Sequence, residues 1–426
     1  MLRRRLLGML AAAIAASTCS QLESSLAPPS APNLVKGTVG RPVVLVNPIS
    51  NGNGTATTIQ EGIDMVASGG RVMVLPGTYA ESLVIDKGLT LEAVGGASGR
   101  VIIEPPGRPV AGVLVTAAGP VTIRDLTVRF GGAFGILGEG AVDVTIEHDS
   151  VIAVDPPLGV GFLIALRGND AAITGARARL SVRESALDGS ITGDRVPPFA
   201  QSFGVGAEGD VDAVVAENVI RRVGGACIFF HPLLDLRGEM NVDILNNDID
   251  ECYPLGKAGS VLIGPSGPFP AVKPPVTGHG TVNVVGNTIR NSTASCLPGT
   301  GISYEWFTGR IERNTIEGVV QGCAGPGSRN RPAAIWVGSR PPANFPPVYP
   351  VVRFNDIVGN AQAGLRIGPN ENSAIDATCN WWGSASGPTG VGTGTGDAVV
   401  VESGAVAPTI VPFAHAPIAR TARTSC

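Results

Sequence analysis

The sequence predicts an all-β fold: a single-stranded right-handed parallel β-helix, a solenoid of stacked coils with an N-terminal amphipathic cap helix and a C-terminal cap. Two observations carry this prediction. The composition, with 58 Gly and 34 Pro among 426 residues and only 15% charged residues, favours short strands joined by turns over helices. One short phrase recurs along the chain at variable intervals, which is the pattern of a repeat protein.

Composition and charge also exclude several classes of protein. Gly has no strict third-residue period, which excludes collagen, and the abundance of Val and Ile excludes a disordered chain. A net charge of -4 provides no basic surface for phosphate groups, so we expect no nucleic-acid partner.

The N-terminus has the features of an export signal. Three arginines, residues 3–5, precede an apolar run at 6–16 that is too short to span a bilayer permanently. Small residues then lead to Cys19, a stretch that looks like a lipoprotein cleavage box. The chain is therefore expected to be exported, either anchored by a lipid on Cys19 or secreted after a cut nearby.

Three segments follow from this interpretation. Residues 1–19 are assigned to the signal peptide and residues 20–39 to a Ser/Pro-rich tether. Residues 40–426 are assigned to the β-helix domain, including its C-terminal cap.

The recurring phrase defines one coil. It contains an apolar residue, two further residues, a polar residue, one more residue and then Ile, Val or Leu. Coils must stack to bury their apolar faces, and Asn at one corner can hold a tight left-handed bend and bond to its copies above and below. The polar centres are Asp125, Asp149, Glu184, Asn218, Asn247, Asn287, Asn314, Asn355 and Asn380.

A second phrase of three residues marks another strand in each coil. Its first and third residues are expected to point inward and its middle residue to face solvent. The copies are Ile228–Phe230, Val261–Ile263, Ile302–Tyr304, Ile335–Val337 and Leu365–Ile367.

The start of the chain resembles a known family. Residues 58–63 (Thr-Ile-Gln-Glu-Gly-Ile) and the following segment 70–79 are similar to the first coils of pectin-lyase-like right-handed β-helix proteins. In that family a short amphipathic helix caps the stack, and Ile59, Ile63 and Val66 have the spacing to cover its open end.

The end of the chain resembles the same superfamily. Residues 380–388 and 396–398 look like the closing coil of its bacterial cell-surface members. The resemblance covers about residues 40 to 415. It implies the fold and says little about activity, because its motifs are caps and turns.

The cysteines are consistent with export. Apart from Cys19 there are six, an even number that indicates disulfides. Cys296 lies nine residues after Asn287 and Cys323 nine after Asn314, which places them at one phase of adjacent coils, at a spacing that a disulfide can bridge. The expected pairs are Cys296–Cys323, Cys227–Cys252 and Cys379–Cys426, the last closing the tail.

Known catalytic signatures of this fold are missing. The phrases typical of pectate lyases and pectin methylesterases do not occur, and of the polygalacturonase phrases only Gly278-His279-Gly280 matches, which we interpret as a turn. The four His lie in different coils or tails, so no metal site is predicted and no cofactor is evident. Calcium held by surface Asp residues between coils is the one metal that stays open.

Register predicts a column of residues on the outer face of the second strand. It should face solvent, with Arg167, Glu208 and His231 on consecutive coils and close enough to pair. Phe229, Trp306 and Trp336 are expected to border it. In order, the column is Glu139, Arg167, Glu208, His231, Gly264, Glu305 and Gly338.

Two interpretations of this column stay open. As a catalytic site it would use Arg167, Glu208, His231 and Glu305, with Glu208 or His231 as base and Arg167 neutralising a substrate carboxylate. The bordering aromatic residues would then bind sugar rings. As a charge ladder, opposite charges on neighbouring strands would simply offset one another.

Three functions are compatible with these observations. The first is binding of a polysaccharide or cell-envelope glycan without turnover. The second is a polysaccharide lyase, hydrolase or epimerase with an atypical site. The third is a structural surface solenoid or adhesin, and the oligomeric state does not follow from the sequence.

Overall fold

The computed structural model describes residues 40–49, 55–96, 100–154, 161–169, 175–191, 202–231, 239–253, 259–264, 280–292, 300–319, 333–338, 349–360, 362–369, 374–418 and 426. Contacts divide the chain into Met1–Val39 and one compact unit, Gly40–Cys426. The expected signal peptide, Cys19 and the tether lie outside the described residues.

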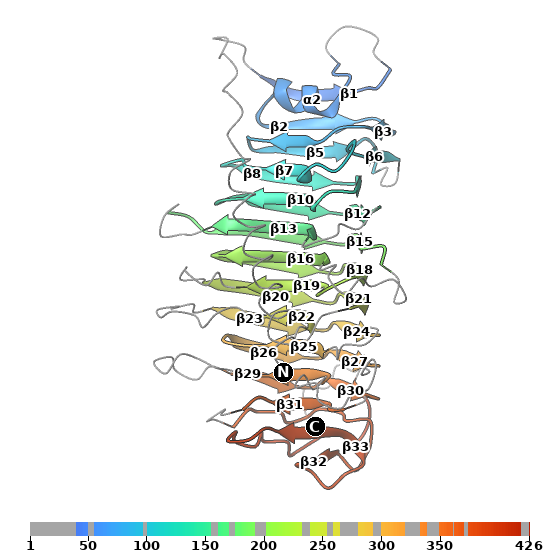
Figure 1. The fold of residues 1–426 in the computed structure, drawn as a ribbon. Helices are drawn as coiled ribbons and strands as arrows, with labels where there is room; N and C mark the ends of the chain where they lie inside the picture. Colours follow the sequence, from blue (N-terminus) through green and yellow to red (C-terminus); the bar gives the residue numbers. More distant parts are fainter. Residues whose placement is uncertain are drawn as a thin grey trace, which may run out of the picture. The chain divides into compact units, whose positions relative to one another are not determined.

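Three parallel sheets run along the compact unit, and the chain visits them in turn in each coil (Figure 1). Sheet A contains β1 (Arg41–Val46), β2 (Val66–Val74), β5 (Leu89–Ala93), β8 (Pro120–Arg124), β11 (Asp143–Glu147), β14 (Ala178–Arg183), β17 (Val211–Ala216), β20 (Met240–Leu245), β23 (Thr281–Val285), β26 (Thr308–Glu312) and β29 (Pro350–Arg353).

Sheet B contains β3 (Gly77–Tyr79), β6 (Val101–Ile103), β9 (Thr127–Phe130), β12 (Ser150–Ala153), β15 (Ala186–Asp188), β18 (Val219–Val223), β21 (Asp248–Cys252), β24 (Thr288–Arg290), β27 (Thr315–Glu317) and β30 (Asp356–Val358). Sheet C contains β4 (Leu83–Ile85), β7 (Ala111–Val115), β10 (Phe134–Glu139), β13 (Gly161–Asn169), β16 (Ser202–Gly209), β19 (Ile228–His231), β22 (Gly259–Ile263), β25 (Thr300–Tyr304), β28 (Ile335–Val337), β31 (Leu365–Ile367), β33 (Gly396–Val401) and β32 (Pro388–Gly390). The predicted parallel β-helix is therefore confirmed.

A continuous apolar core fills the inside of the coils. The first and third residues of the predicted three-residue phrase lie in it, as Ile228 and Phe230 show, both 0% exposed. The expectation that the middle residue faces solvent is wrong. Phe229 and Ser303 lie outside this core, on the other face of sheet C, yet are only 8% and 0% exposed. Strand alternation predicts the direction of a side chain, whereas its exposure also depends on its neighbours in adjacent coils.

A ladder of buried asparagines follows the corner between sheets A and B. The backbone N and the Nδ2 of Asn218 both donate to Oδ1 of Asn247, at 3.0 and 2.9 Å, and Nδ2 also donates to the carbonyl oxygen of Val182. Each side chain thus satisfies buried polar groups of the next coil and of the previous one, which holds the register of the stack. The pattern repeats at Asn247, Asn287, Asn314 and Asn355 and reaches Asn380.

Two details of the predicted corner are wrong. In two early coils the ladder position is Leu126 or Ser185, one residue after the predicted Asp125 and Glu184. The left-handed bend is made by the residue before the ladder position, which leaves the ladder side chain free to point along the stack. The bending residues, all with positive φ, are Asp125, His148, Glu184, Glu217, Asn246, Gly286, Arg313, Phe354 and Cys379.

A short helix caps the first coil, as predicted. Helix α2 (Ile59–Met65) begins after Thr58, whose side chain accepts a hydrogen bond from the backbone N of Glu61. The carboxylate of Glu81 accepts from the first backbone N–H groups of the helix, which have no partner within it. Ile59, Ile63 and Val66 are buried against the open end of the stack, as expected from their spacing.

The C-terminal segment closes the other end of sheet A. The backbone N of Ala377 donates to the carbonyl oxygen of Thr409 at 2.8 Å, and the backbone N of Ala414 donates to that of Asn380 at 3.0 Å. Trp382 is fully buried in the central core.

Two expected disulfides are present. Cys227 and Cys252 are bonded with a Cα separation of 5.7 Å, and Cys379 is bonded to Cys426. The expected Cys296–Cys323 pair lies outside the described residues. Within the described ranges, no helix has both the length and the apolar character that a membrane crossing requires.

Candidate functional site

The predicted column on sheet C exists. Glu139 pairs in register with Arg167 and Glu208 with His231, on four consecutive strands, β10, β13, β16 and β19. The side chains of Arg167 and Glu208 lie 3.4 Å apart, between Nε and Oε2, and are 40% and 23% exposed. The predicted pairing of these two residues is therefore confirmed.

The guanidinium of Arg167 is held from two sides. Its carbon Cζ lies 5.5 Å from the centre of the Phe134 ring, in the position of a cation–π contact, while Nε points toward Glu208. No further hydrogen bond joins Nη1 or Nη2 to the described residues. The Arg167 side chain is thus fixed at its base and exposes a fork of N–H donors.

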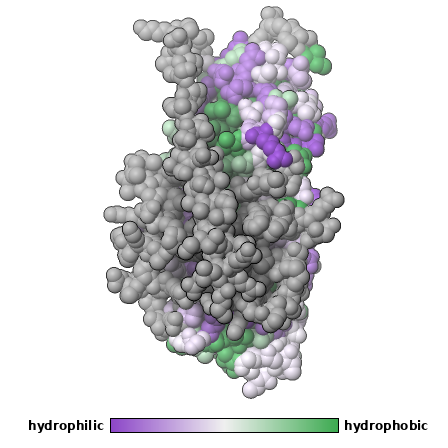
Figure 2. Space-filling view, viewed as in Figure 1, coloured by the Kyte–Doolittle hydropathy of each residue, from purple (hydrophilic) through white to green (hydrophobic). Residues whose placement is uncertain are grey.

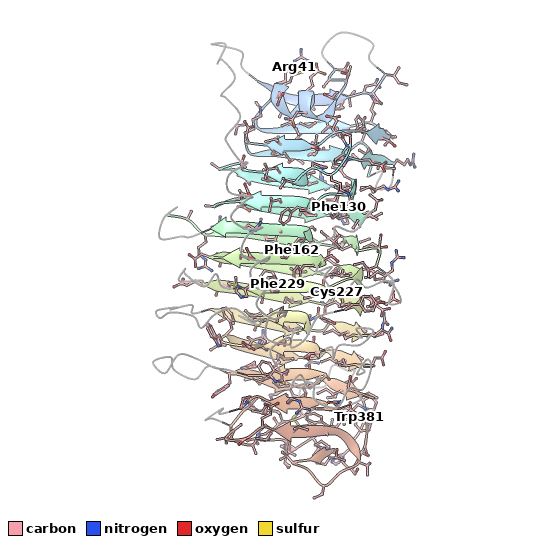
Figure 3. The ribbon with its side chains drawn as sticks, in the orientation of Figure 1. Arg41, Phe130, Phe162, Cys227, Phe229 and Trp381 are labelled. Carbon is pink, nitrogen blue, oxygen red and sulfur yellow. A yellow bond between two sulfur atoms is a disulfide. The ribbon has the colours of Figure 1, made fainter. Side chains whose placement is uncertain are left out.

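An aromatic row runs beside this column on the outer face of sheet C. The rings of Phe134, Phe162, Phe203 and Phe229 follow one another with centroid separations of 6.0, 4.8 and 4.8 Å. Figure 3 labels Phe162 on β13 and Phe229 on β19, with the β16 strand that carries Phe203 between them. Phe134 and Phe162 are only 6% and 5% exposed, so the row supports the column more than it offers open ring faces.

His231 departs from its predicted surroundings. It is 5% exposed and stacks on the Phe229 ring at 5.6 Å between centroids. Burial lowers the pKa of His231 to about 4, so its imidazole is neutral at neutral pH. The prediction that His231 faces solvent is wrong, because the aromatic row and its neighbours enclose the ring.

The remaining predicted residues lie in later coils. Glu305 follows β25 and is half-buried, while Trp306 is packed in the central core beside Phe307 and does not border the column. Trp336 belongs to a separate outer cluster with Ala333 and Ala363, away from Phe229. The structure therefore brings together Arg167, Glu208, His231 and Phe229, and it separates Trp306 and Trp336 from them.

Three site residues were missed by sequence reasoning. Phe134, Phe162 and Phe203 occupy equivalent positions of consecutive strands. An aromatic residue two places before the first apolar residue of three successive phrases, at Ile136, Ile164 and Val205, was the available signal.

Neither the search for a metal site nor the comparison with known proteins indicates a particular function. Among the described residues, no group of three or more His, Cys, Asp or Glu side chains is arranged to hold a metal ion, and calcium between coils stays a prediction. Comparison of the sequence with family models and with curated proteins found no match in either. The fold and the disulfides define the class of the chain: a disulfide-bonded parallel β-helix repeat protein.

Proposed function

We propose that the chain is an exported β-helix protein of the pectin-lyase-like superfamily that binds an acidic polysaccharide or cell-envelope glycan on the outer face of sheet C. The observation that carries the proposal is the exposed fork of Arg167, fixed between Glu208 and Phe134. A guanidinium whose two terminal nitrogens have no hydrogen-bond partner among the described residues fits a carboxylate by paired hydrogen bonds. A uronate residue of a sugar chain supplies such a carboxylate.

The surroundings of Arg167 favour binding over turnover. Glu208 accepts a hydrogen bond from the Arg167 guanidinium. The nearby positive charge makes the Glu208 carboxylate a poorer acceptor for a substrate proton. His231 is a weak general base, because burial lowers its pKa to about 4, and its ring is buried and stacked on Phe229. A lyase, hydrolase or epimerase is kept as the alternative for which Glu208 would be the proton-transfer group.

Export is supported by disulfide chemistry. The Cys227–Cys252 bond joins two adjacent coils inside the core, and disulfides of this kind persist in oxidising compartments. Lipid attachment at Cys19 belongs to the same proposal. Incorporation of labelled fatty acid by the full-length chain in a bacterial host, lost in Cys19→Ser, would distinguish an anchored protein from a secreted one.

Polysaccharide binding is tested with one matched pair of variants. Titration calorimetry with polygalacturonate and alginate should show binding by the parent chain, weakened about tenfold in Arg167→Gln, because one charge-assisted contact is lost. Arg129→Gln is the control. Arg129, on sheet B, is as exposed as Arg167, at 40%, and pairs with Glu104 at 3.9 Å, so its replacement should leave binding unchanged.

The same experiment separates binding from catalysis. Glu208→Gln keeps the shape of the side chain and should leave affinity within about threefold of the parent. Unsaturated or reducing-end products that form with the parent and vanish in Glu208→Gln would establish the enzyme alternative. Equal losses in Arg167→Gln and Arg129→Gln would contradict the assignment of the site to sheet C.

A further inference from the structure

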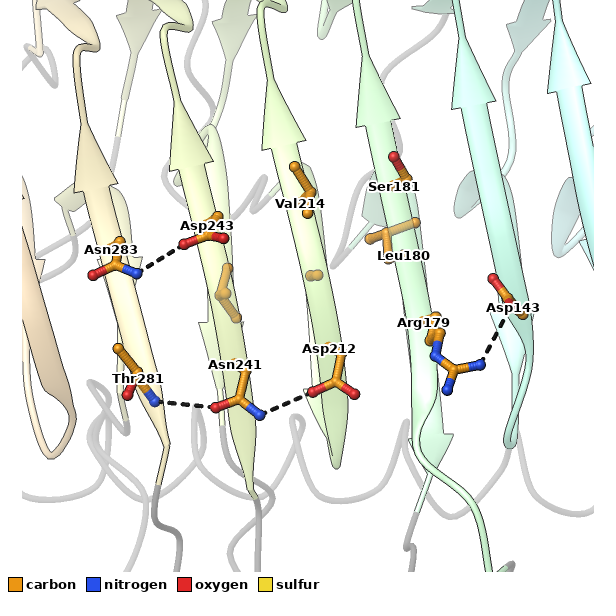
Figure 4. A pocket seen from close by; sticks show the side chains of 12 residues that line it. Asp143, Arg179, Leu180, Ser181, Asp212, Val214, Asn241, Asp243, Thr281 and Asn283 are labelled. Carbon is orange, nitrogen blue, oxygen red and sulfur yellow. Dashed lines mark hydrogen bonds and ion pairs between the residues drawn. The ribbon is translucent and has the colours of Figure 1, made fainter.

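A groove of about 440 Å³ crosses the outer face of sheet A, on strands β11, β14, β17, β20 and β23. It belongs to a different sheet from the Arg167 column. Its middle is hollowed because Ser181 and Val214 carry short side chains, and longer polar side chains stand on either side of them (Figure 4). Five parallel strands at the usual spacing give it a length on the order of 20 Å along the stack.

Two carboxylate–carboxamide pairs line the groove. Nδ2 of Asn241 donates to Oδ1 of Asp212 at 3.0 Å, and Nδ2 of Asn283 donates to Oδ1 of Asp243 at 2.8 Å. Figure 4 shows both pairs on the open side of the sheet. Oδ1 of Asn241 accepts a long hydrogen bond from the backbone N of Thr281, and Oδ1 of Asn283 accepts one from Nε of Arg310. Each pair still offers one carboxylate oxygen, the second lone pair of the carboxamide oxygen and one amide hydrogen.

The charges in the groove are unevenly compensated. Asp143 pairs with Arg179 at 3.5 Å, and Asp212 pairs with Arg177 at 2.9 Å. Burial raises the pKa of Asp212, but hydrogen bonds from Arg177 and Asn241 outweigh it, so the pKa is lowered and the carboxylate stays charged. The described residues place no cation within ion-pair distance of Asp243. The groove therefore has an uncompensated negative charge close to its centre.

We propose that this groove binds a glycan chain carrying free amino groups, with one protonated amine next to Asp243. The amine compensates the carboxylate, which already has Asn283 as one hydrogen-bond partner. The two Asp–Asn pairs hydrogen-bond sugar hydroxyls, since a diol needs acceptors and donors side by side. Val214 offers the apolar face of a sugar ring a small contact surface. A basic peptide would compensate the same charge, so the test below includes a lysine hexamer.

Calorimetry with a glucosamine hexamer and an N-acetylglucosamine hexamer tests the proposal. At a pH where the free amine is protonated, the glucosamine hexamer should bind at least about tenfold more tightly, because only it carries the compensating charge. Its affinity should fall with added salt. In Asp243→Asn the preference between the two hexamers should disappear.

Two further variants separate the groove from the rest of the sheet. Val214→Arg fills the middle of the groove and should abolish binding of the glucosamine hexamer. Thr122→Arg places the same side chain in the same column of sheet A, three strands away on β8, and should leave binding unchanged. Circular dichroism of both variants checks that the fold is intact.

Several results would overturn the proposal. These are equal binding of the two hexamers, equal effects of Val214→Arg and Thr122→Arg, or binding of a lysine hexamer as tight as that of the glucosamine hexamer. Arg167→Gln serves as an independence test. It should not change binding of the glucosamine hexamer, so failure of this groove and failure of the acidic-glycan site on sheet C are separately observable.

Discussion

One carboxyl group takes the place of a carboxamide in the ladder. Asp149 is 2% exposed, its Oδ1 accepts from the backbone N of Leu126 at 2.7 Å, and its Oδ2 has no hydrogen-bond partner in the described part of the chain. Burial raises the pKa of Asp149 well above its usual value, only partly opposed by the hydrogen bond from Leu126. Among the described ladder side chains, Asp149 is therefore the one whose charged form is disfavoured by burial at neutral pH.

We expect Asp149→Asn to stabilise the protein. An Asn side chain can donate to a backbone carbonyl of the preceding coil, as Asn218 does to Val182. Replacing the unpaired Oδ2 by a hydrogen-bonded amide should raise the free energy of unfolding by about 1–3 kcal/mol. Because the folded-state pKa is raised, the stability of the parent is highest below the unfolded-state pKa of Asp and is lost as pH rises through the folded-state pKa. Denaturant titrations at several pH values should show the variant's advantage growing with pH, and no advantage at neutral pH would contradict this account.

His231 titrates with the opposite consequence. Its pKa is lowered to about 4 by burial, so stability is fully present above the unfolded-state pKa and decreases as pH falls from about 6.5 to about 4. The total loss is on the order of 3 kcal/mol. We expect His231→Gln to flatten this part of the pH–stability curve, measured as the difference from the parent, and parallel curves would show that another group is responsible.

The column was predictable at the level of register but not of exposure. Arg167, Glu208 and His231 follow from counting, because each coil repeats the same strand phrase. His231 stacks on Phe229 of its own strand, and Phe229 in turn stacks on Phe203 of the preceding coil. The burial of His231 therefore depends partly on packing between coils, which no single phrase encodes. For the same reason Trp306, next to Glu305 in sequence, turns into the core.

The asparagine corner is densely hydrogen-bonded. Oδ1 of Asn287 accepts both the backbone N and the Nδ2 of Asn247, at 2.9 Å each, and its own Nδ2 donates to Asn314. Asn287→Ala should lower the free energy of unfolding by at least about 2 kcal/mol, because it leaves the buried N–H of Asn247 unpaired. Asn241→Ala, at an exposed asparagine of the neighbouring sheet A strand, is the control and should cost less than about 0.5 kcal/mol. Denaturant unfolding measures both variants. Similar losses in the free energy of unfolding would contradict a structural role specific to the ladder.

The Cys227–Cys252 bond links adjacent coils across a sequence separation of 25 residues. Restricting a loop of that length in the unfolded chain contributes about 3 kcal/mol. We expect the double variant Cys227→Ala, Cys252→Ala to unfold at correspondingly lower denaturant concentration than the oxidised parent. Since both cysteines are buried in the core, mild reductant should not reproduce this loss until the chain unfolds.

Only part of the corner could be predicted from the sequence. The strong Asn copies were located correctly because Asn combines with a fixed apolar spacing. At Leu126 and Ser185 the ladder position lacks an Asn, and the acidic residue before it, which makes the bend, was mistaken for it.

For the whole molecule, the two ends are the weak points of a stack of parallel strands. Each inner strand has two neighbours, whereas an end strand exposes unpaired N–H and carbonyl groups that promote aggregation. The segment 409–414 covers the C-terminal edge of sheet A through backbone hydrogen bonds, and Ile410 and Ile418 are buried with it.

We expect a chain that ends at Gly404 to self-associate, because the edge formed around Ala377 is then open. A chain that ends at Ile418 loses Cys426 and its disulfide but keeps the covering segment, and it should retain the oligomeric state of the parent. Light scattering coupled to size-exclusion chromatography distinguishes the two. If both chains self-associate, the disulfide protects the edge. If neither chain self-associates, the covering segment is dispensable.

The repeated corner also has a consequence for how such a chain can change over generations. From Asn247 to Asn355 each coil carries its own bend and its own ladder Asn, and each of these Asn residues has an Asn in the coil on either side. Duplication of a gene segment that encodes one coil would therefore insert a ready-made unit and lengthen the molecule by about 4.8 Å, with caps and side-chain columns merely shifted apart. Length is thus a heritable trait that selection can tune in discrete increments, independently of the chemistry on any one coil.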